Sequence, residues 1–336
     1  MIDIALIGAG LIGSVHADSL IHMPEVQLRA VCDIQYDRAL QIAKSVNAIA
    51  FADIQSLIAS PVWENIDVVL VCVPTYLHEE MVVIAATHKK HIFCEKPIAL
   101  TEVSAARMIE VCAKNQVLFG VGHVVRFFPE YVKLREQVVA GGIGEIGTIR
   151  TFRGGVFPYG WDSWYGDEEK SGGILVDLLI HDLDFIDAMI NPIEQLFARR
   201  ISTHHRKERD YALVVGRLRN GAIFHMEATW AHSSGFRYGF EYAGSRGMIE
   251  FDSEKTPPLQ LMTKPSPTAV GHHTAVVPES PFLKSPYQVE LEAFLAAVQE
   301  RRVPPITGET ALRALQLSLA ARRSAQELKP ILVQNV

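Results

Sequence analysis

Three glycines near the N-terminus have the spacing of a dinucleotide-binding turn. Gly8, Gly10 and Gly13 form the pattern G-x-G-x-x-G, directly after the apolar run at residues 2–7 and before a helical pattern. In this setting the first glycine permits a tight turn, the second lets the backbone approach a pyrophosphate, and the third lets helix and strand pack closely. The helix N-terminus offers free N–H groups and a partial positive charge to the phosphates. The predicted cofactor contacts here are Gly8, Gly10, Leu11, Ile12 and Gly13.

An acidic residue follows at the distance that this kind of site requires. Asp33 ends the second apolar run, 20 residues after Gly13. A carboxylate at this position accepts hydrogen bonds from a ribose 2′-hydroxyl and repels a 2′-phosphate. None of the next three residues is an arginine, although Arg38 lies within one helical turn. We therefore expect NAD, with NADP as the less favoured cofactor.

Three further side chains have the chemistry of proton transfer. Lys96 lies in the segment Glu-Lys-Pro after another apolar run, where Pro97 favours an extended backbone and holds the ammonium at the end of the strand. Asp177 and His181 are four residues apart in a helical pattern at residues 175–190, which would place them on one face. Their neighbours are apolar, so both side chains should be buried, and a buried carboxylate or imidazole is costly unless it is hydrogen-bonded or serves a function. A satisfied Asp–His pair remains an alternative to catalysis.

A metal site is a weaker alternative for the same segment. Asp182 and Asp184 add two carboxylates to Asp177 and His181, but on a helix they point to different faces from the first pair. We therefore expect no metal ion.

The elements that position these residues fall into two groups. Up to about residue 122, short apolar strands alternate with helical patterns, which predicts a doubly wound parallel sheet, the Rossmann arrangement. Ligands bind such sheets at the carboxyl ends of the strands, where Pro74, Thr75, Glu95 and Lys96 fall. The expected NAD-binding domain covers residues 1–122.

Beyond that point consecutive strand patterns replace the alternation. Asn220-Gly221 separates two of these runs and is a strong hairpin signal. We expect an α+β domain with a large, mostly antiparallel sheet over residues 123–305, which would bind substrate and mediate self-association. A C-terminal helix within residues 306–336 is expected to pack back on the first domain.

Composition excludes several classes of protein. The 336 residues carry 32 Lys and Arg against 38 Asp and Glu, so the net charge is -6. This balance gives no reason to expect a nucleic-acid partner. No apolar run approaches the ~20 residues that span a bilayer, and the N-terminus shows no export signal. We expect a cytoplasmic protein without a membrane partner.

Taken together, the motifs resemble those of the Gfo/Idh/MocA oxidoreductases, which include inositol dehydrogenases and glucose–fructose oxidoreductase. The resemblance extends over essentially the whole chain and rests on residues 8–13, 74–78 (PTYLH), 95–97 (EKP), 172–182 (GGILVDLLIHD) and 306–309 (ITGE). It implies that Lys96, Asp177 and His181 form the catalytic group. It also implies cofactor contacts from Pro74, Thr75, His78, Glu95 and Lys96.

The resemblance implies an NAD-dependent dehydrogenase that moves a hydride between a cyclic polyol or sugar, inositol-like or pyranose-like, and the nicotinamide. In alcohol oxidation His181 would accept the hydroxyl proton, and Lys96 would stabilise the developing alkoxide. Asp177 would orient the imidazole and favour its protonated form. Members of the family commonly form dimers or tetramers through the C-terminal sheet, so a homodimer or homotetramer is expected.

The substrate is less well defined by the sequence. The segment at residues 157–173 offers flat aromatic surfaces for a sugar ring and one carboxylate, from Tyr159, Trp161, Asp162, Trp164 and Tyr165. Arg126, and more weakly His123, follow the sixth strand and would reach a polar substrate. Each of these side chains has simple packing as its alternative.

Two other functions remain open at this stage. A nucleotide sugar such as a UDP-hexosamine would need a basic patch for its diphosphate, with Arg150, Arg153, Arg237 and Arg246 as candidates. A non-catalytic, dinucleotide-sensing regulator would retain the fold without the chemistry.

Overall fold

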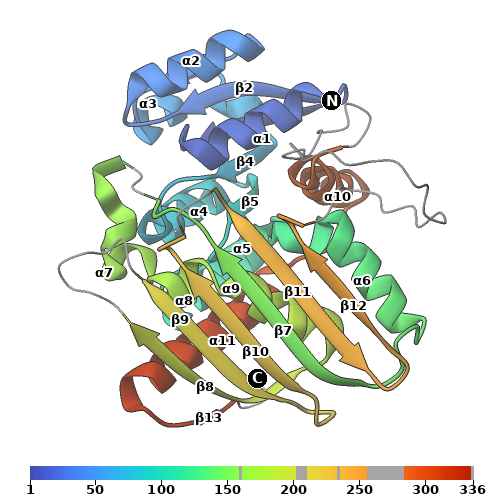
Figure 1. Ribbon diagram of the computed structural model, residues 1–336. Coiled ribbons are helices and arrows are strands. Elements are labelled where there is room, and N and C mark those ends of the chain that lie inside the picture. Colours follow the sequence, from blue (N-terminus) through green and yellow to red (C-terminus); the bar gives the residue numbers. More distant parts are fainter. Residues whose placement is uncertain (159–160, 202–209, 233–234, 256–283, 334–336) are drawn as a thin grey trace, which may run out of the picture.

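The computed structural model describes residues 1–158, 161–201, 210–232, 235–255 and 284–333, and two sheets organise this part of the chain (Figure 1). Within it, no helix is both long and apolar enough to cross a membrane.

The first sheet is parallel and has six strands in the order β3-β2-β1-β4-β5-β6. The strands are β1 (Ile2–Ile7), β2 (Val26–Cys32), β3 (Ile49–Phe51), β4 (Val68–Val71), β5 (His91–Glu95) and β6 (Phe119–Gly122). Helices cross between them: α1 (Leu11–Ile21), α2 (Tyr36–Val46), α3 (Ile54–Ile58), α4 (His78–Thr87) and α5 (Glu102–Asn115). The strand order reverses between β1 and β4, where such sheets bind ligands. The predicted doubly wound sheet is confirmed.

The second sheet is mixed and mostly antiparallel, with the order β12-β11-β7-β10-β9-β8-β13. Its strands are β7 (Ile146–Gly154), β8 (Ile193–Ile201), β9 (Tyr211–Leu218), β10 (Ile223–Thr229), β11 (Arg237–Gly244), β12 (Gly247–Asp252) and β13 (Ile331–Leu332). Within this second sheet, β7 and β10 form the only parallel pair among the described strands. The expected hairpin joins β9 to β10, and Gly221 has the positive φ of 89° that its turn needs.

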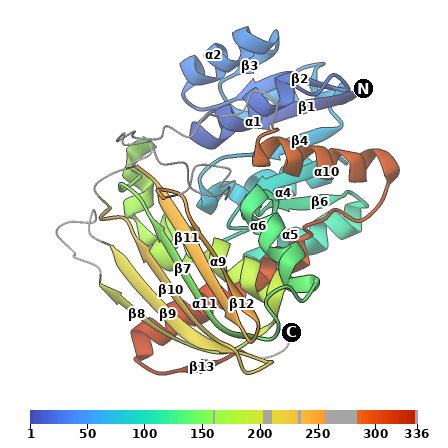
Figure 2. The same ribbon diagram turned by 45° about the vertical axis from the view of Figure 1, so that its right-hand side comes forward.

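Helices cover one face of this second sheet, and no described element covers the other (Figures 1 and 2). The covering layer includes α8 (Ile174–Asp177), α9 (Ile180–Phe185) and α11 (Gly308–Glu327). Early in α11, Ala311 and Leu315 pack into the core of the first sheet, whereas Leu317 and Ala321 pack into the core of the second. The C-terminal helix therefore packs on both sheets, beyond the expected contact with the first.

The helix α10 (Pro286–Glu300) belongs by packing to the first sheet. Its buried side chains Leu291, Phe294 and Leu295 share a core with α1, α2 and one face of β1. The sequence range 123–305 expected for the second domain thus contains a helix whose core contacts lie elsewhere.

The expected single helix at residues 175–190 is wrong. The segment consists of α8, then α9, then the π-helix η5 (Ile186–Ile190). Between α8 and α9, the backbone N–H of Leu179 donates to the carbonyl of Ile174, five residues earlier, at 3.0 Å. A bond of this π type inserts one residue into the helical register. The four-residue spacing of Asp177 and His181 therefore does not stack their side chains as it would on a regular helix.

Candidate active site

The glycine-rich turn between β1 and α1 has two glycines that the fold requires and one that faces open space. A Cβ at Gly8, where φ is 99°, would lie 2.5 Å from the carbonyl of Cys72 after β4, and a Cβ at Gly13 would lie 2.0 Å from the carbonyl oxygen of Gly8. A Cβ at Gly10 would meet nothing within 4 Å. Gly10 is also the N-cap of α1 and provides no side-chain cap. The first-turn N–H groups therefore face a cradle that suits a pyrophosphate.

Asp33 is held at the edge of this cradle by the turn itself. Its Oδ2 accepts the backbone N–H of Ala9 at 2.7 Å, and its Oδ1 accepts that of Gln35 at 2.7 Å. Two apolar side chains beside the cradle are unusually exposed, Leu11 at 81% and Ile34 at 67%. Exposed apolar surface next to a fixed carboxylate is what the adenosine half of a dinucleotide would cover. These residues fit the expected cofactor.

Lys96 joins the two parts of the molecule. It follows β5, and its Nζ donates to the backbone carbonyl of Asp177 at 2.7 Å and to Asp177 Oδ1 at 2.9 Å. Asp177 ends α8, which packs against the second sheet. This ion pair therefore links the end of a strand of the first sheet to a helix of the second sheet. The structure thus brings together two of the three residues expected to form the catalytic group.

His181 lies near Lys96 but is not bonded to Asp177. The pKa of its imidazole is lowered well below the usual value, first by burial and then by Lys96, Arg153 and His123. Its Nδ1 is buried and has no hydrogen-bond partner among the described residues. The expectation that Asp177 orients this ring and favours its protonated form is therefore wrong, because the carboxylate pairs with Lys96 instead. The lowered pKa favours the neutral form of this imidazole.

His78, one of the predicted cofactor residues, acts inside the fold. Both ring nitrogens of buried His78 lie 2.9 Å from backbone carbonyl oxygens, those of Val73 and Pro97, so this ring ties together the loops that follow β4 and β5. Pro74 and the buried Thr75 belong to the first of these loops. Burial lowers the pKa of His78. His78 thus positions the strand ends rather than presenting its ring to a ligand.

Glu95 is likewise turned inward, toward a residue that the sequence analysis missed. Its Oε1 lies 2.6 Å from Nε2 of buried His16 on α1, and its Oε2 accepts the backbone N–H of Lys96 at 3.1 Å. Burial acts to raise the pKa of Glu95, but the hydrogen bond and charge of His16, together with Lys96, outweigh it and lower that pKa. The pair therefore fixes the backbone of Lys96 to the helix that begins at the cradle.

Arg126, expected to reach a substrate, has its guanidinium engaged. It lies in the 3₁₀ segment η3 (Val124–Phe127), and its Nε and Nη2 donate to Asp184 at 2.7 and 2.5 Å. The buried His123 ring also faces Asp184, at 3.4 Å. Asp182 is bound in the same way by Arg153. Within the described residues, no group of three or more His, Cys, Asp or Glu side chains could hold a metal ion.

The aromatic segment is described only in part. Tyr159 and the side chain of Trp161 lie outside the described residues. The rings of Trp164 and Tyr165 stack with centroids 3.9 Å apart. Burial raises the pKa of Tyr165, and the nearby charges of Asp177 and Glu95 raise it further. Tyr165 therefore lies within electrostatic range of the Asp177 carboxylate.

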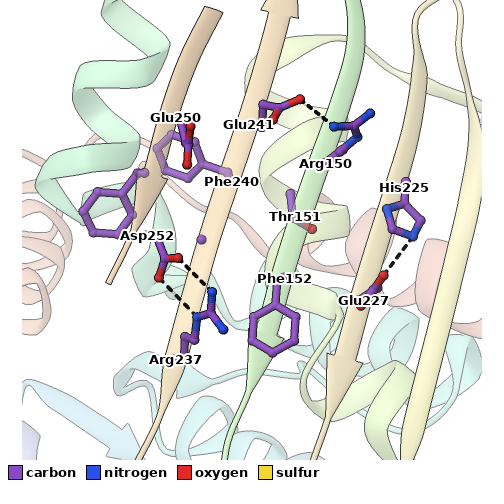
Figure 3. A pocket seen from close by; sticks show the side chains of 12 residues that line it. Arg150, Thr151, Phe152, His225, Glu227, Arg237, Phe240, Glu241, Glu250 and Asp252 are labelled. Atoms are coloured by element: carbon purple, nitrogen blue, oxygen red, sulfur yellow. Dashed lines mark hydrogen bonds and ion pairs between the residues drawn. The ribbon is translucent and has the colours of Figure 1, made fainter. Parts of the chain in front are cut away.

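The four arginines considered for a diphosphate do not gather beside Lys96. Arg150 pairs with Glu241 at 3.0 Å and Arg237 with Asp252 at 2.8 Å on the uncovered face of the second sheet (Figure 3). Arg246 donates to the carbonyl of Gly141, and Arg153 is buried against Asp182. The site offers no basic patch for a nucleotide sugar among these residues.

Comparison with known proteins agrees with this arrangement. Residues 2–123 match the model of the Gfo/Idh/MocA oxidoreductase family's NAD-binding Rossmann fold, and residues 135–333 match that of its C-terminal alpha/beta domain. The chain is 30% identical over 340 residues to the myo-inositol 2-dehydrogenase of Thermotoga maritima, covering 99% of each chain. It is 27% identical over 334 residues to the inositol 2-dehydrogenase of Rhizobium meliloti, covering 97% of each. The crystal structure of a probable dehydrogenase from Thermotoga maritima superposes with a TM-score of 0.82 at 29% identity, covering 98% of each chain.

Proposed function

The chain belongs to the Gfo/Idh/MocA family of NAD-binding oxidoreductases, and on this premise we propose that it oxidises a ring hydroxyl of a cyclic polyol, inositol-like or pyranose-like, with NAD. The single observation that supports the chemistry best is the Lys96 ammonium, held by Asp177 within electrostatic reach of a neutral His181. The names of the inositol dehydrogenases to which the chain is similar support the substrate class.

The proposed division of labour follows from these groups. Lys96 would donate a hydrogen bond to the reacting hydroxyl and stabilise the negative charge that develops on its oxygen, as a preorganised donor does. Asp177 holds the ammonium in place through two contacts. Since Nδ1 of His181 is buried, its Nε2 is the nitrogen we assign to accept the hydroxyl proton. When bound along Gly8–Gly13 and Asp33, NAD supplies the hydride acceptor.

The test is a substrate screen with the purified protein. Inositol isomers and pyranoses are offered with NAD, and formation of reduced cofactor is followed by absorbance. Turnover with at least one cyclic polyol or sugar is expected. Turnover confined to nucleotide sugars would replace the substrate class, and cofactor binding without turnover on any compound would favour a dinucleotide-sensing regulator.

Asp33 gives a prediction about cofactor choice. Replacing it with serine removes the carboxylate that repels a 2′-phosphate, so the ratio of kcat/KM with NAD to that with NADP should fall by roughly 10-fold or more. Initial rates with both cofactors measure this ratio. Asp53, which caps α3 through the backbone N–H of Ser56, offers a matched control, and Asp53→Ser should keep the preference for NAD. Equal use of both cofactors by the wild-type protein would contradict the role of Asp33.

We also propose that two copies associate through the uncovered face of the second sheet. A hollow on this face carries both signs of charge, in the ion pairs Arg150–Glu241 and Arg237–Asp252, beside the partly buried ring of Phe152 (Figure 3). A surface that carries both signs can complement itself across a two-fold axis. Light scattering should give a homodimer or homotetramer, and Phe152→Glu should yield folded monomers. A wild-type protein that is monomeric at every concentration would contradict this proposal.

We expect the protein to act in the cytoplasm. Its four cysteines are unpaired thiols in the structure, as in proteins of reducing compartments.

A further inference from the structure

The residue that follows His181 forms one of the most deeply buried ion pairs in the described structure. Asp182 on α9 accepts two hydrogen bonds from Arg153 on β7, one from Nε at 2.9 Å and one from Nη2 at 3.1 Å. The side chains of Arg153 and Asp182 are 4% and 1% exposed. Arg153 Nη2 also donates to the hydroxyl of Tyr131 at 3.0 Å, and its guanidinium lies 5.7 Å from the centre of the Tyr238 ring. Asp182, the hydroxyl of Tyr131 and the ring of Tyr238 therefore fix the orientation of this guanidinium.

Such a pair restricts how α9 can move. Asp182 adjoins His181, so a rotation of α9 that displaced the imidazole would strain both bonds to Arg153. Asp184, two residues further, is held by Arg126. Residues two apart on a helix point to nearly opposite sides. The helix that carries His181 is thus held from the second sheet on one side and from η3 on the other. A buried ion pair rarely stabilises a fold better than apolar packing would. The role of this pair is therefore sought in its effect on the adjacent His181.

Arg153 of this pair contributes to the charge around the imidazole. The positively charged or protonatable groups that act on His181 are Lys96 after β5, Arg153 on β7 and His123 before η3. The nearest carboxylates on α8 and α9 are already bonded: Asp177 to Lys96, Asp182 to Arg153 and Asp184 to Arg126. No described carboxylate is bonded to His181 to stabilise an imidazolium.

We infer that the Arg153–Asp182 pair positions His181 and keeps it in the unprotonated form that accepts a proton. Arg153 and Asp182 are thus positioning residues that act through His181, and this inference rests on the proposed role of that histidine. Arg153 supplies a cation that opposes protonation, and Asp182 limits that effect and aims the helix.

This inference is tested by replacing each partner of the ion pair in turn, because the two replacements should shift the pKa of His181 in opposite directions. Arg153→Gln removes the cation and leaves an unpaired carboxylate beside the ring, so the pKa of His181 should rise by roughly one pH unit. Asp182→Asn leaves the guanidinium uncompensated, so that pKa should stay below the wild-type value. The readout is NMR titration of histidine ring signals in the NAD-free protein, with the His181 signal assigned by its loss in His181→Gln. This readout does not depend on turnover.

Kinetics give the second readout and the controls. The acid limb of kcat/KM should move to higher pH in Arg153→Gln and to lower pH in Asp182→Asn. Arg153→Lys restores the charge without the fork, so it should return the pKa of His181 to near the wild-type value while kcat stays about 10-fold low. The matched control is Asp187→Asn, which breaks the Arg313–Asp187 fork at 3.0 and 3.1 Å in the adjoining π-helix and should leave the pKa of His181 unchanged.

The outcomes separate this inference from the proposed function. Shifts of the His181 pKa in the same direction in Arg153→Gln and Asp182→Asn, or no shift in either, would overturn the inference even if the wild-type enzyme is active. Should Arg153→Gln fail to fold, a raised pKa in the isosteric Asp182→Asn would overturn it equally. Opposite shifts in a protein that oxidises no polyol would support the inference and reject the proposed reaction.

Discussion

Lys96→Met is expected to lower kcat for polyol oxidation by about 10²–10³-fold, the usual effect of removing a preorganised charged donor. The Lys96 ammonium is held by the backbone and the carboxylate of Asp177, so it is in place before substrate arrives. Methionine has a similar length but neither charge nor donor, and it leaves Asp177 as an unneutralised carboxylate beside the reacting oxygen. Both changes disfavour a developing alkoxide. The Kd for NAD, measured by calorimetry, should change little.

The chain provides a matched control on the same strand. Lys90 directly precedes β5 and Lys96 directly follows it, so the two lysines flank one strand at opposite ends of the sheet. Lys90 is also largely buried, and its Nζ donates to the carbonyl of Glu64 at 3.2 Å. Lys90→Met should cost some stability and leave kcat near the wild-type value. Equal losses of kcat in the two variants would show that the effect at Lys96 is structural.

Gly10→Val should abolish NAD binding in a protein that still folds. A Cβ at this position would meet no protein atom within 4 Å, and the backbone, with φ of -76° and ψ of -165°, is open to any residue. The valine would fill the cradle before α1 and block the phosphates from the helix N-terminus. We expect the Kd for NAD to rise at least ~100-fold, equivalent to about 2.7 kcal/mol, with the melting temperature nearly unchanged.

Gly13→Ala distinguishes a blocked ligand from a broken turn. Its Cβ would lie 2.0 Å from the carbonyl oxygen of Gly8, so the turn itself must shift and both stability and binding should fall. Wild-type affinity for NAD in Gly10→Val would place the cofactor elsewhere and remove the premise of the site.

Local patterns were sufficient to predict most of the fold. The alternation of apolar strands with helices specified the doubly wound sheet, and Asn220-Gly221 specified the β9–β10 hairpin. The packing of α10 on the first sheet was not predictable, because its partners in α1 and β1 lie more than 260 residues away in sequence. The break between α8 and α9 was also hidden, since Leu178 and Leu179 favour a regular helix as readily as a π-type bond.

The sequence indicated which residues belong to the site better than it indicated which of them contact one another. Spacing along one segment suggested that Asp177 serves His181, whereas the carboxylate reaches Lys96, 81 residues earlier in the chain. Arg126 was assigned to the substrate because the sequence does not reveal that its guanidinium is bound by Asp184, 58 residues later in the chain. His16 gave one weak indication, a polar residue on the buried side of the helix after the glycine turn. Tyr165 was placed in the right segment, but its closeness to Asp177 follows only from the assembled fold.

In the proposed reaction Lys96 and His181, from different layers of the molecule, act together on one hydroxyl. A double-mutant cycle measures this directly: kcat/KM with NAD and the best cyclic polyol is determined for the wild type, Lys96→Met, His181→Gln and the double variant. Groups that act as a unit lose their effects together, so the double variant should be about as slow as the slower single variant. Losses that multiply, as for two independent sites, would contradict the account.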